Sequence, residues 1–170
     1  MGLSPFLVYE PADGPDEVAT LLAVAWAERV LECADEVDRA EDRHGINLRV
    51  GERMDYDSPP DENESFRRLW VAHHTLVWSC GQLLQWLKVA IDDVDQPNFA
   101  SELKTWRNAL EHLDESNIEG AMASADEAKS KPQSIRNIGT IMIGNSGSAG
   151  LASFASTADI REWVGPMISA

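Results

Sequence analysis

Residues 61–91, DENESFRRLWVAHHTLVWSCGQLLQWLKVAI, decide the fold of this chain. Asp61, followed three residues later by Glu64, resembles a capping box and predicts that a helix begins here. A helix that is apolar on more than one face lies at the centre of a bundle or faces a second chain. We therefore expect this helix to be the central element of a helical fold. One of its apolar stripes contains Leu69, Leu76, Cys80, Leu83 and Leu87, and the other contains Phe66, Trp70, Val77, Leu84 and Ile91.

A second long helix is predicted before the central one, from residue 16 to about residue 44. This stretch contains neither Gly nor Pro, and Gly45 is expected to end it. Residues 45–60 are expected to form a linker. The apolar positions of the helix recur at intervals of three and four: Ala23, Trp26, Val30, Cys33, Val37 and Ala40. Its other face is expected to be acidic and solvated, because it carries Asp35, Glu36, Asp38, Glu41 and Asp42.

A third helix is predicted after Pro97 and Asn98, which interrupt the chain, and Asn98 can serve as its cap. Residues 121–131 combine small and charged side chains and are a candidate for a short fourth helix. The apolar residues of the third helix repeat at intervals of four and three: Phe99, Leu103, Trp106, Leu110 and Leu113.

The composition changes at Pro132. Residues 135–143 are rich in β-branched side chains, residues 145–150 have the composition of a turn, and residues 151–155 can return as a second strand. Ser156 or Thr157 can then cap a short helix that runs through Trp163 and stops at Gly165-Pro166. The patterns together predict a mainly α protein. They place an N-terminal lead at residues 1–15, an antiparallel helical bundle at residues 16–130, and a small β-hairpin with a short helix at residues 131–170.

The totals favour one domain in the cytoplasm. A chain of 170 residues can bury one sizeable core. No run approaches the ~20 apolar residues of a membrane span, and the first residues lack the basic region and apolar run of a secretion signal. We therefore expect a cytoplasmic protein that does not enter a membrane. Cys33 and Cys80 fall on apolar helix faces and are expected to be buried thiols.

The net charge of −15 opposes nucleic-acid binding at long range, but this charge is unevenly distributed. Residues 10–64 carry 17 acidic side chains against 5 arginines, whereas residues 65–170 carry 12 acidic against 9 basic side chains. The half of the chain that contains the third predicted helix is therefore close to neutral.

The third helix carries the run Arg107-Asn108-Ala109-Leu110-Glu111-His112. At 100° per residue, Arg107 lies about 80°, Asn108 about 180° and His112 about 220° from the apolar stripe. Asn108 and His112 therefore point away from the core and are neighbours, so the amide can orient the imidazole. Arg107 can pair with Glu111, four residues later.

This run resembles the R-x4-6-H signature of the HEPN family of helical ribonucleases and RNase toxins, and residues 16–130 resemble the family's helical bundle. The resemblance implies that Arg107 and His112 are the catalytic pair and that Asn108 is the polar residue that follows the arginine. It implies a homodimer whose two protomers share one composite cleft, an RNA substrate, and no metal or cofactor. A toxin or phage-defence effector, with an antitoxin or another protein as partner, is the role that it implies.

The chemistry of these side chains suits RNA cleavage. An imidazole can exchange protons with the 2′-hydroxyl or the leaving 5′-oxygen, and a guanidinium can stabilise charge on the phosphoryl oxygens. The resemblance implies attack by the RNA's own 2′-hydroxyl, which leaves a 2′,3′-cyclic phosphate and a 5′-hydroxyl end. His73 and His74, by contrast, point about 100° apart on a helix and cannot chelate one metal, so we expect both to be packed or hydrogen-bonded.

Three other interpretations remain open. Arg107, Asn108 and His112 can simply be solvated residues of a surface helix. The bundle and dimer can also belong to a non-catalytic HEPN-like interaction module. Finally, the acidic N-terminal half can act as a nucleic-acid mimic or antitoxin-type protein that binds a basic partner.

Overall fold

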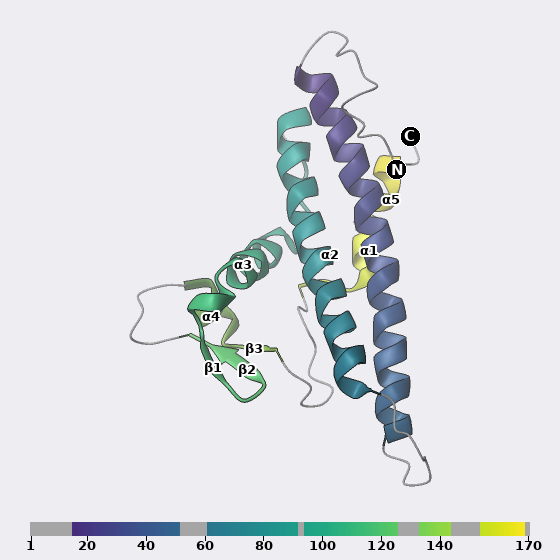
Figure 1. Cartoon of the computed structure of the whole chain (residues 1–170). Coiled ribbons are helices and arrows are strands. Elements are labelled where there is room, and N and C mark those ends of the chain that lie inside the picture. The colour runs from purple at the N-terminus through teal and green to yellow at the C-terminus, as the bar shows by residue number, and fades with distance from the viewer. Residues whose placement is uncertain (1–14, 52–60, 92–93, 126–132, 144–153, 169–170) are drawn as a thin grey trace, which may run out of the picture.

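The structure is a computed structural model that describes residues 15–51, 61–91, 94–125, 133–143 and 154–168. Within these ranges the protein is mainly helical and has one small three-stranded antiparallel sheet, so the predicted mainly α class is confirmed. The dominant elements are two long antiparallel helices, α1 (Pro15–Gly51) and α2 (Glu62–Ala90). Figure 1 shows the two helices side by side, with the sheet on the side of α2 away from α1.

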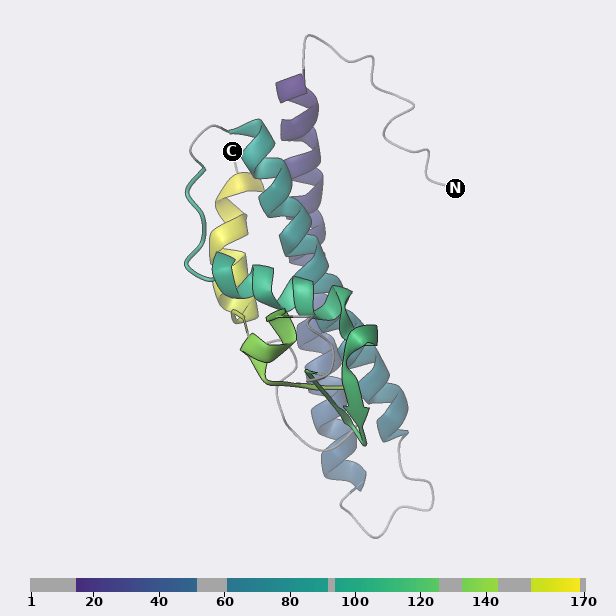
Figure 2. The ribbon, with the colours of Figure 1, turned by 90° about the vertical axis from the view of Figure 1, so that its left-hand side faces the viewer.

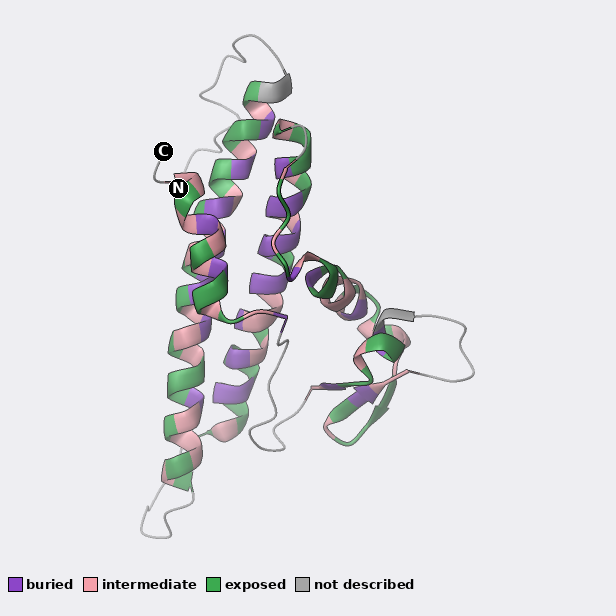
Figure 3. Cartoon of the chain, turned by 180° about the vertical axis from the view of Figure 1, so that it is seen from behind, coloured by how far each residue is buried: buried purple, intermediate pink, exposed green. Residues whose placement is uncertain are grey.

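The central helix begins where its sequence predicts. Asp61 is the N-cap of α2, and its Oδ1 accepts a hydrogen bond from the backbone N–H of Glu64 at 2.9 Å. One apolar stripe is buried along its length, as expected: Leu69, Leu76, Cys80, Leu83 and Leu87. The other stripe is buried at Phe66, Val77 and Leu84, and Ile91 is exposed. Figure 3 shows that the buried surfaces of α1 and α2 face each other.

The first helix does not stop at Gly45 but continues to Gly51, so the predicted end is wrong. An isolated glycine costs a helix about 1 kcal/mol, which tertiary contacts can outweigh. The contact here comes from His44, which is only 6% exposed. Its Nδ1 lies 2.9 Å from Ser65 Oγ, and its ring packs edge-on against Phe66. The start of α2 therefore holds the end of α1 in helical form.

The third helix, α3 (Ala100–Glu111), crosses α2 on the side opposite α1 (Figures 1 and 2). Its apolar repeat is confirmed, since Phe99 and Leu103 are buried, and Trp106 and Leu110 pack against the main core. The predicted cap is wrong, because Phe99 is the N-cap and makes no side-chain capping bond. The Phe99 ring is instead buried in the main core.

The last helix, α5 (Thr157–Ile168), packs against α1. Ser156 caps it as predicted: its Oγ and the Asp159 backbone N–H lie 3.1 Å apart, and Asp159 Oδ2 accepts from the Ser156 N–H at 3.1 Å. The predicted stop at Gly165-Pro166 is wrong, because the helix passes through both residues. Pro166 removes one helical hydrogen bond, but Met167 and Ile168 contact the main core and keep the last turn helical.

An aromatic cluster joins α5 to the start of α3. The Phe99 ring lies 5.5 Å from the Trp163 ring and 5.8 Å from the Phe154 ring, both in edge-on geometry. Ile160 and Val164 of α5 are fully buried in the same core. This cluster brings together segments more than forty residues apart in the chain.

The acidic face of α1 is not only solvated, as expected, but also anchors α5. Arg161 Nη2 donates to Asp35 Oδ1 at 2.7 Å and to Asp38 Oδ2 at 2.6 Å, and the Thr157 hydroxyl donates to Asp38 Oδ1 at 2.7 Å. Burial is the largest single effect on the pKa of Asp38 and raises it, but the hydrogen bonds from Thr157 and Arg161 and the charge of Arg161 outweigh it, so the pKa is lowered. Glu41 and Asp42 on the same helix are exposed.

The sheet is built from strands β1 (Asn117–Glu119), β2 (Met122–Ser124) and β3 (Thr140–Met142), in that order and antiparallel. Gly120, at φ +60°, makes the turn between β1 and β2, a conformation that glycine adopts without penalty. Ala123 pairs with Ile118 on one side and with Ile141 on the other. The short turn η2 (Leu113–Glu115) links α3 to β1.

Two predictions for this region are wrong. Residues 122–124 form β2 and not part of a fourth helix, while residues 126–131 lie outside the described residues. Residues 133–138 form the helix α4 (Gln133–Ile138), so only the later part of the predicted strand 135–143 is a strand. Its partner among the described residues is β2, and residues 151–153 of the predicted return strand lie outside the described residues.

A second, smaller core lies beneath the sheet. It contains Ala109 of α3, Ala123, Ile135 and Ile141, all at most 2% exposed. It therefore draws residues from both sides of residue 131, the boundary that the sequence patterns predict. This core connects the sheet to the end of α3, where the arginine and histidine of interest lie.

Both cysteines are free and buried, as predicted. Cys33 Sγ lies 3.6 Å from Ser79 Oγ across the α1–α2 contact, and burial raises the pKa of both thiols. None of the helices in the described part of the chain combines the length and apolar content that a bilayer crossing requires.

Candidate functional site at the end of helix α3

Arg107 lies on the side of α3 that faces α2. Its side chain is 23% exposed and passes over Gly81. A Cβ atom at residue 81 would lie only 3.0 Å from Arg107 Cδ. Gly81 therefore provides the space that the arginine occupies between the two helices.

The guanidinium of Arg107 has two polar neighbours on its own helix. Its Nε lies 3.5 Å from Glu111 Oε1, so the predicted ion pair is confirmed, and its Nη2 donates to Asn108 Oδ1 at 3.4 Å. The Nε–H is buried, and this ion pair lacks the geometry of a hydrogen bond, so the Nε–H has no hydrogen-bond acceptor among the residues that the structure describes. An additional acceptor at this position would therefore satisfy a buried donor.

Arg107 also lines a groove of about 410 Å³ between α2 and α3. Two further cations line it, Lys88 of α2 and Lys104 of α3, together with the amides of Gln85 and Gln96. None of the described residues that line this groove is acidic. In a chain with 29 acidic and 14 basic side chains, this groove is a local site of positive charge.

His112 is the residue immediately after α3 and not a member of the helix, because the helix ends at Glu111. Its side chain is 47% exposed, and its Nδ1 lies 2.9 Å from Glu115 Oε1. No described residue forms a hydrogen bond with His112 Nε2. The predicted role of Asn108 in orienting this ring is wrong: Asn108 bonds to Arg107, and Glu115 holds the imidazole.

The structure does not join Arg107 and His112 within one chain. The arginine side chain packs toward α2, whereas the imidazole is exposed beyond the end of α3. No hydrogen bond or ion pair connects the two among the residues that the structure describes. A site that uses both groups on one phosphate therefore needs a second copy of the chain or a movement of the α3 end.

Sequence reasoning missed four residues of this region: Gly81, Lys88, Lys104 and Glu115. Gly81 and Lys88 lie 26 and 19 residues before Arg107 in the chain. They approach its side chain only because α3 crosses α2. Glu115 stands three residues after His112, a spacing that brings two side chains together in a helical turn. That pairing depends on η2, the turn that continues the chain after the helix ends.

The two adjacent histidines of α2 have structural contacts, as expected. His73 Nε2 lies 3.0 Å from Glu41 Oε1, and the His74 ring packs edge-on against Trp70. Burial lowers the pKa of both imidazoles, and the Glu41 carboxylate partly offsets this for His73. Within the described residues, no three His, Cys, Asp or Glu side chains converge in a way that could hold a metal ion.

Comparison with known proteins identifies no relative. No family model matches the chain, and neither a curated protein nor a solved structure shows significant similarity to it.

Proposed function

We propose that this protein is a HEPN-like, metal-independent endoribonuclease that acts as a homodimer. The observation that carries the proposal is the exposed imidazole of His112, whose Nδ1 is held by Glu115 while Nε2 faces no described partner. A carboxylate on Nδ1 fixes the tautomer and leaves Nε2 available to accept or donate a proton. This arrangement suits a general acid or base.

The positive groove between α2 and α3 supports an RNA substrate. Lys88, Lys104 and Arg107 can contact phosphate oxygens, and Arg107 can stabilise the charge that builds on the scissile phosphate. His112 exchanges protons with the attacking 2′-hydroxyl or the leaving 5′-oxygen. The products are then a 2′,3′-cyclic phosphate and a 5′-hydroxyl end.

The homodimer is part of the proposal because one chain does not join its arginine to its histidine. In a two-fold dimer that pairs the ends of the α3 helices, His112 of one copy can face Arg107 of the other. Ile118 and Met122, on the strands that follow, are 58% and 48% exposed and can contribute apolar contacts. The HEPN-like bundle, the cytoplasmic location and a role as toxin or phage-defence effector with a protein partner belong to the same proposal.

Cleavage of RNA in the presence of EDTA tests this function. We expect the wild type to produce cyclic phosphate ends, and Arg107→Ala and His112→Ala to lose at least about a hundredfold in rate, the typical contribution of such groups. Arg49→Ala, an exposed arginine at the end of α1, is the matched control and should keep full activity. Activity that persists unchanged in the two site variants would exclude this mechanism.

A non-catalytic interaction module is the second candidate, and the surroundings of Arg107 favour it. The side chain packs over Gly81 and pairs with Glu111, which are contacts that a purely structural arginine makes. In that case no preparation cleaves RNA, and Arg107→Ala lowers thermal stability or changes the oligomeric state. The acidic-mimic interpretation gains no such support, because Asp35 and Asp38 already bind Arg161.

A further inference from the structure

A second hollow lies between α1 and α2, on the part of this helix pair near the start of α2. It has a volume of about 600 Å³ and is lined by four arginines, of which two lie on each helix. A neighbouring hollow of about 430 Å³ shares Arg43, Glu64, Ser65 and Arg68 with it. The four arginines are Arg39, Arg43, Arg67 and Arg68, and the lining acids of the larger hollow are Glu36 and Glu64.

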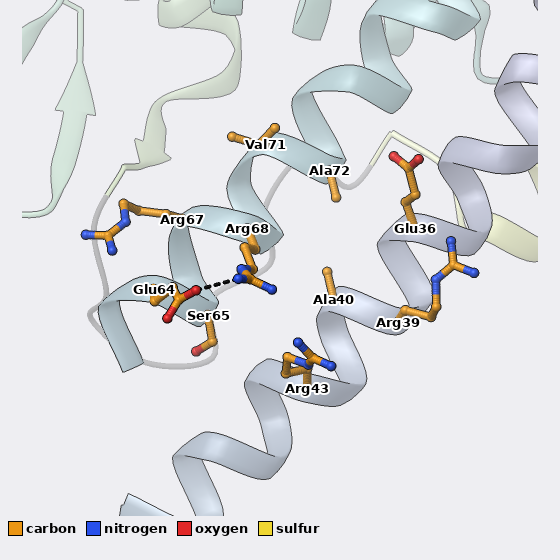
Figure 4. A pocket seen from close by; sticks show the side chains of 10 residues that line it. All are labelled: Glu36, Arg39, Ala40, Arg43, Glu64, Ser65, Arg67, Arg68, Val71 and Ala72. Atoms are coloured by element: carbon orange, nitrogen blue, oxygen red, sulfur yellow. Dashed lines mark hydrogen bonds and ion pairs between the residues drawn. The ribbon is translucent and has the colours of Figure 1, made fainter. Parts of the chain in front are cut away.

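The hollow exists because small side chains occupy the helix faces at this level. Figure 4 shows Ala40 and Ala72 pointing from opposite helices into the space, with Val71 at its edge. Arg43 and Arg68 extend toward the same space from opposite sides, and Arg39 and Arg67 lie at its outer edges. The result is an apolar floor with the guanidinium groups of Arg43 and Arg68 beside it, while those of Arg39 and Arg67 are directed outward.

The charges in this arginine hollow are only partly balanced. Glu64 pairs with Arg68, and Glu36 pairs with Arg29 at 3.2 Å. Arg39, Arg43 and Arg67 form no ion pair with any residue that the structure describes, although acidic residues are abundant on α1. Like charges held around one hollow repel each other unless an anion lies between them.

Phosphate is the anion that this arrangement fits best. Guanidinium groups form paired hydrogen bonds with phosphate oxygens and stack on the faces of aromatic rings. The apolar floor offers a surface for a base, and the volume is that of a small-ligand site. A hollow of about 600 Å³ has room for one small ligand and not for an extended nucleic-acid strand.

We propose that the arginine hollow between α1 and α2 binds a nucleotide through two or more of its phosphates. Arg43 contacts the phosphates from α1, and Arg68 contacts them from α2 by exchanging its ion pair with Glu64 for a phosphate oxygen. Arg39 and Arg67 add charge at the edges, and the base lies against Ala40 and Ala72. The hollow does not include Arg107 or His112, so this proposal does not depend on the ribonuclease proposal.

Calorimetric titration of the full chain in EDTA with ADP, pyrophosphate and adenosine tests this inference. We expect saturable binding of ADP and of pyrophosphate, competition between them for one site, and much weaker binding of adenosine. Loss of charge-assisted hydrogen bonds in the double variant Arg43→Gln/Arg68→Gln should weaken ADP binding at least about a hundredfold. Arg49→Gln removes one arginine charge on α1 outside the hollow and should leave the affinity within about twofold.

Circular dichroism of each variant shows whether the fold is retained. We expect it to be retained, because Arg43, Arg49 and Arg68 are exposed. The inference is overturned if the wild type binds neither ADP nor pyrophosphate at millimolar concentration. It is also overturned if the double variant binds ADP as tightly as the Arg49→Gln control. A further outcome is that a short single-stranded RNA binds through Arg43 and Arg68 when ADP and pyrophosphate do not. That result would show that the hollow binds single-stranded RNA and would refute the proposed nucleotide site.

Discussion

Replacing Gly81 by alanine would show whether α2 positions Arg107. The new Cβ would lie 3.0 Å from Arg107 Cδ, so the arginine side chain must move by a few tenths of an ångström. Arg107 Cδ, the atom that must move, belongs to a flexible side chain and not to the backbone. The substitution should therefore displace the guanidinium without disturbing the helix pair.

Two opposing effects set the magnitude. Alanine stabilises a helix interior by about 1 kcal/mol relative to glycine. A displaced arginine rotamer costs about 0.5–1.5 kcal/mol, and a weakened, partly exposed pair with Glu111 costs less than about 0.5 kcal/mol. We therefore expect a change of less than about 1 kcal/mol in the free energy of unfolding of Gly81→Ala.

Gly45→Ala is the matched control. Gly45 is also a helical glycine, but its added Cβ would meet no atom within 4 Å. Only the helix gain of about 1 kcal/mol applies, which corresponds to a rise in Tm of about 2–4 °C for a chain of this size. Thermal unfolding followed by circular dichroism measures both variants, and RNA cleavage is assayed on the same samples.

The comparison of the two variants is decisive. We expect Gly81→Ala to be less stabilising than Gly45→Ala and, on the proposed function, to be the only one of the two that reduces cleavage. If Gly81→Ala raises Tm as much as Gly45→Ala does, the arginine does not rest on Gly81 and the packing argument is refuted.

Buried polar and titratable groups provide three further tests. Ser65→Ala removes the partner of the buried His44 imidazole and should lower the free energy of unfolding by about 1–3 kcal/mol in urea titrations; an unchanged midpoint would contradict the contact. Burial lowers the pKa of His73 and His74, so their stability contribution is present above the ordinary histidine pKa of about 6.5 and is lost as the pH falls below it. Unfolding at about pH 8 and about pH 5.5 should show this loss, and His73→Gln should reduce it. Burial also raises the pKa of Cys80, so mass spectrometry should find no alkylation of this thiol in the native protein at about pH 8 and rapid alkylation in denaturant.

Periodicity in the sequence was sufficient to locate the main helices. The repeat of Phe99, Leu103, Trp106 and Leu110 predicted α3, and the two stripes of α2 predicted its central place. These patterns are local: apolar side chains three and four residues apart lie on one helix face whatever the rest of the chain does. Asp61 and Ser156 could be predicted as helix caps for the same reason, because an N-cap side chain bonds to residues in the first turn of the helix that it caps.

Helix ends and strands depended on distant contacts. Gly45 did not end α1 because His44 reaches Ser65, and Pro166 did not end α5 because the residues after it pack on the main core. The sheet pairs residues 122–124 with residues 140–142, and no local pattern selects this partner over residues 151–155. The β-propensity of a segment cannot identify its partner strand, because the pairing depends on which side chains become buried together.

The sequence alone determined which side chains this protein has for chemistry, and the run from Arg107 to His112 stood out for its residue types and spacing. Only the tertiary structure decided what surrounds them: Gly81 beneath the arginine, Glu115 on the imidazole, and a groove shared with Lys88 and Lys104. The arginine hollow between α1 and α2 is likewise a product of helix pairing. Helical periodicity is set by neighbours along the chain, whereas a binding site is set by which faces the core draws together, and burial energy depends on all of the elements at once.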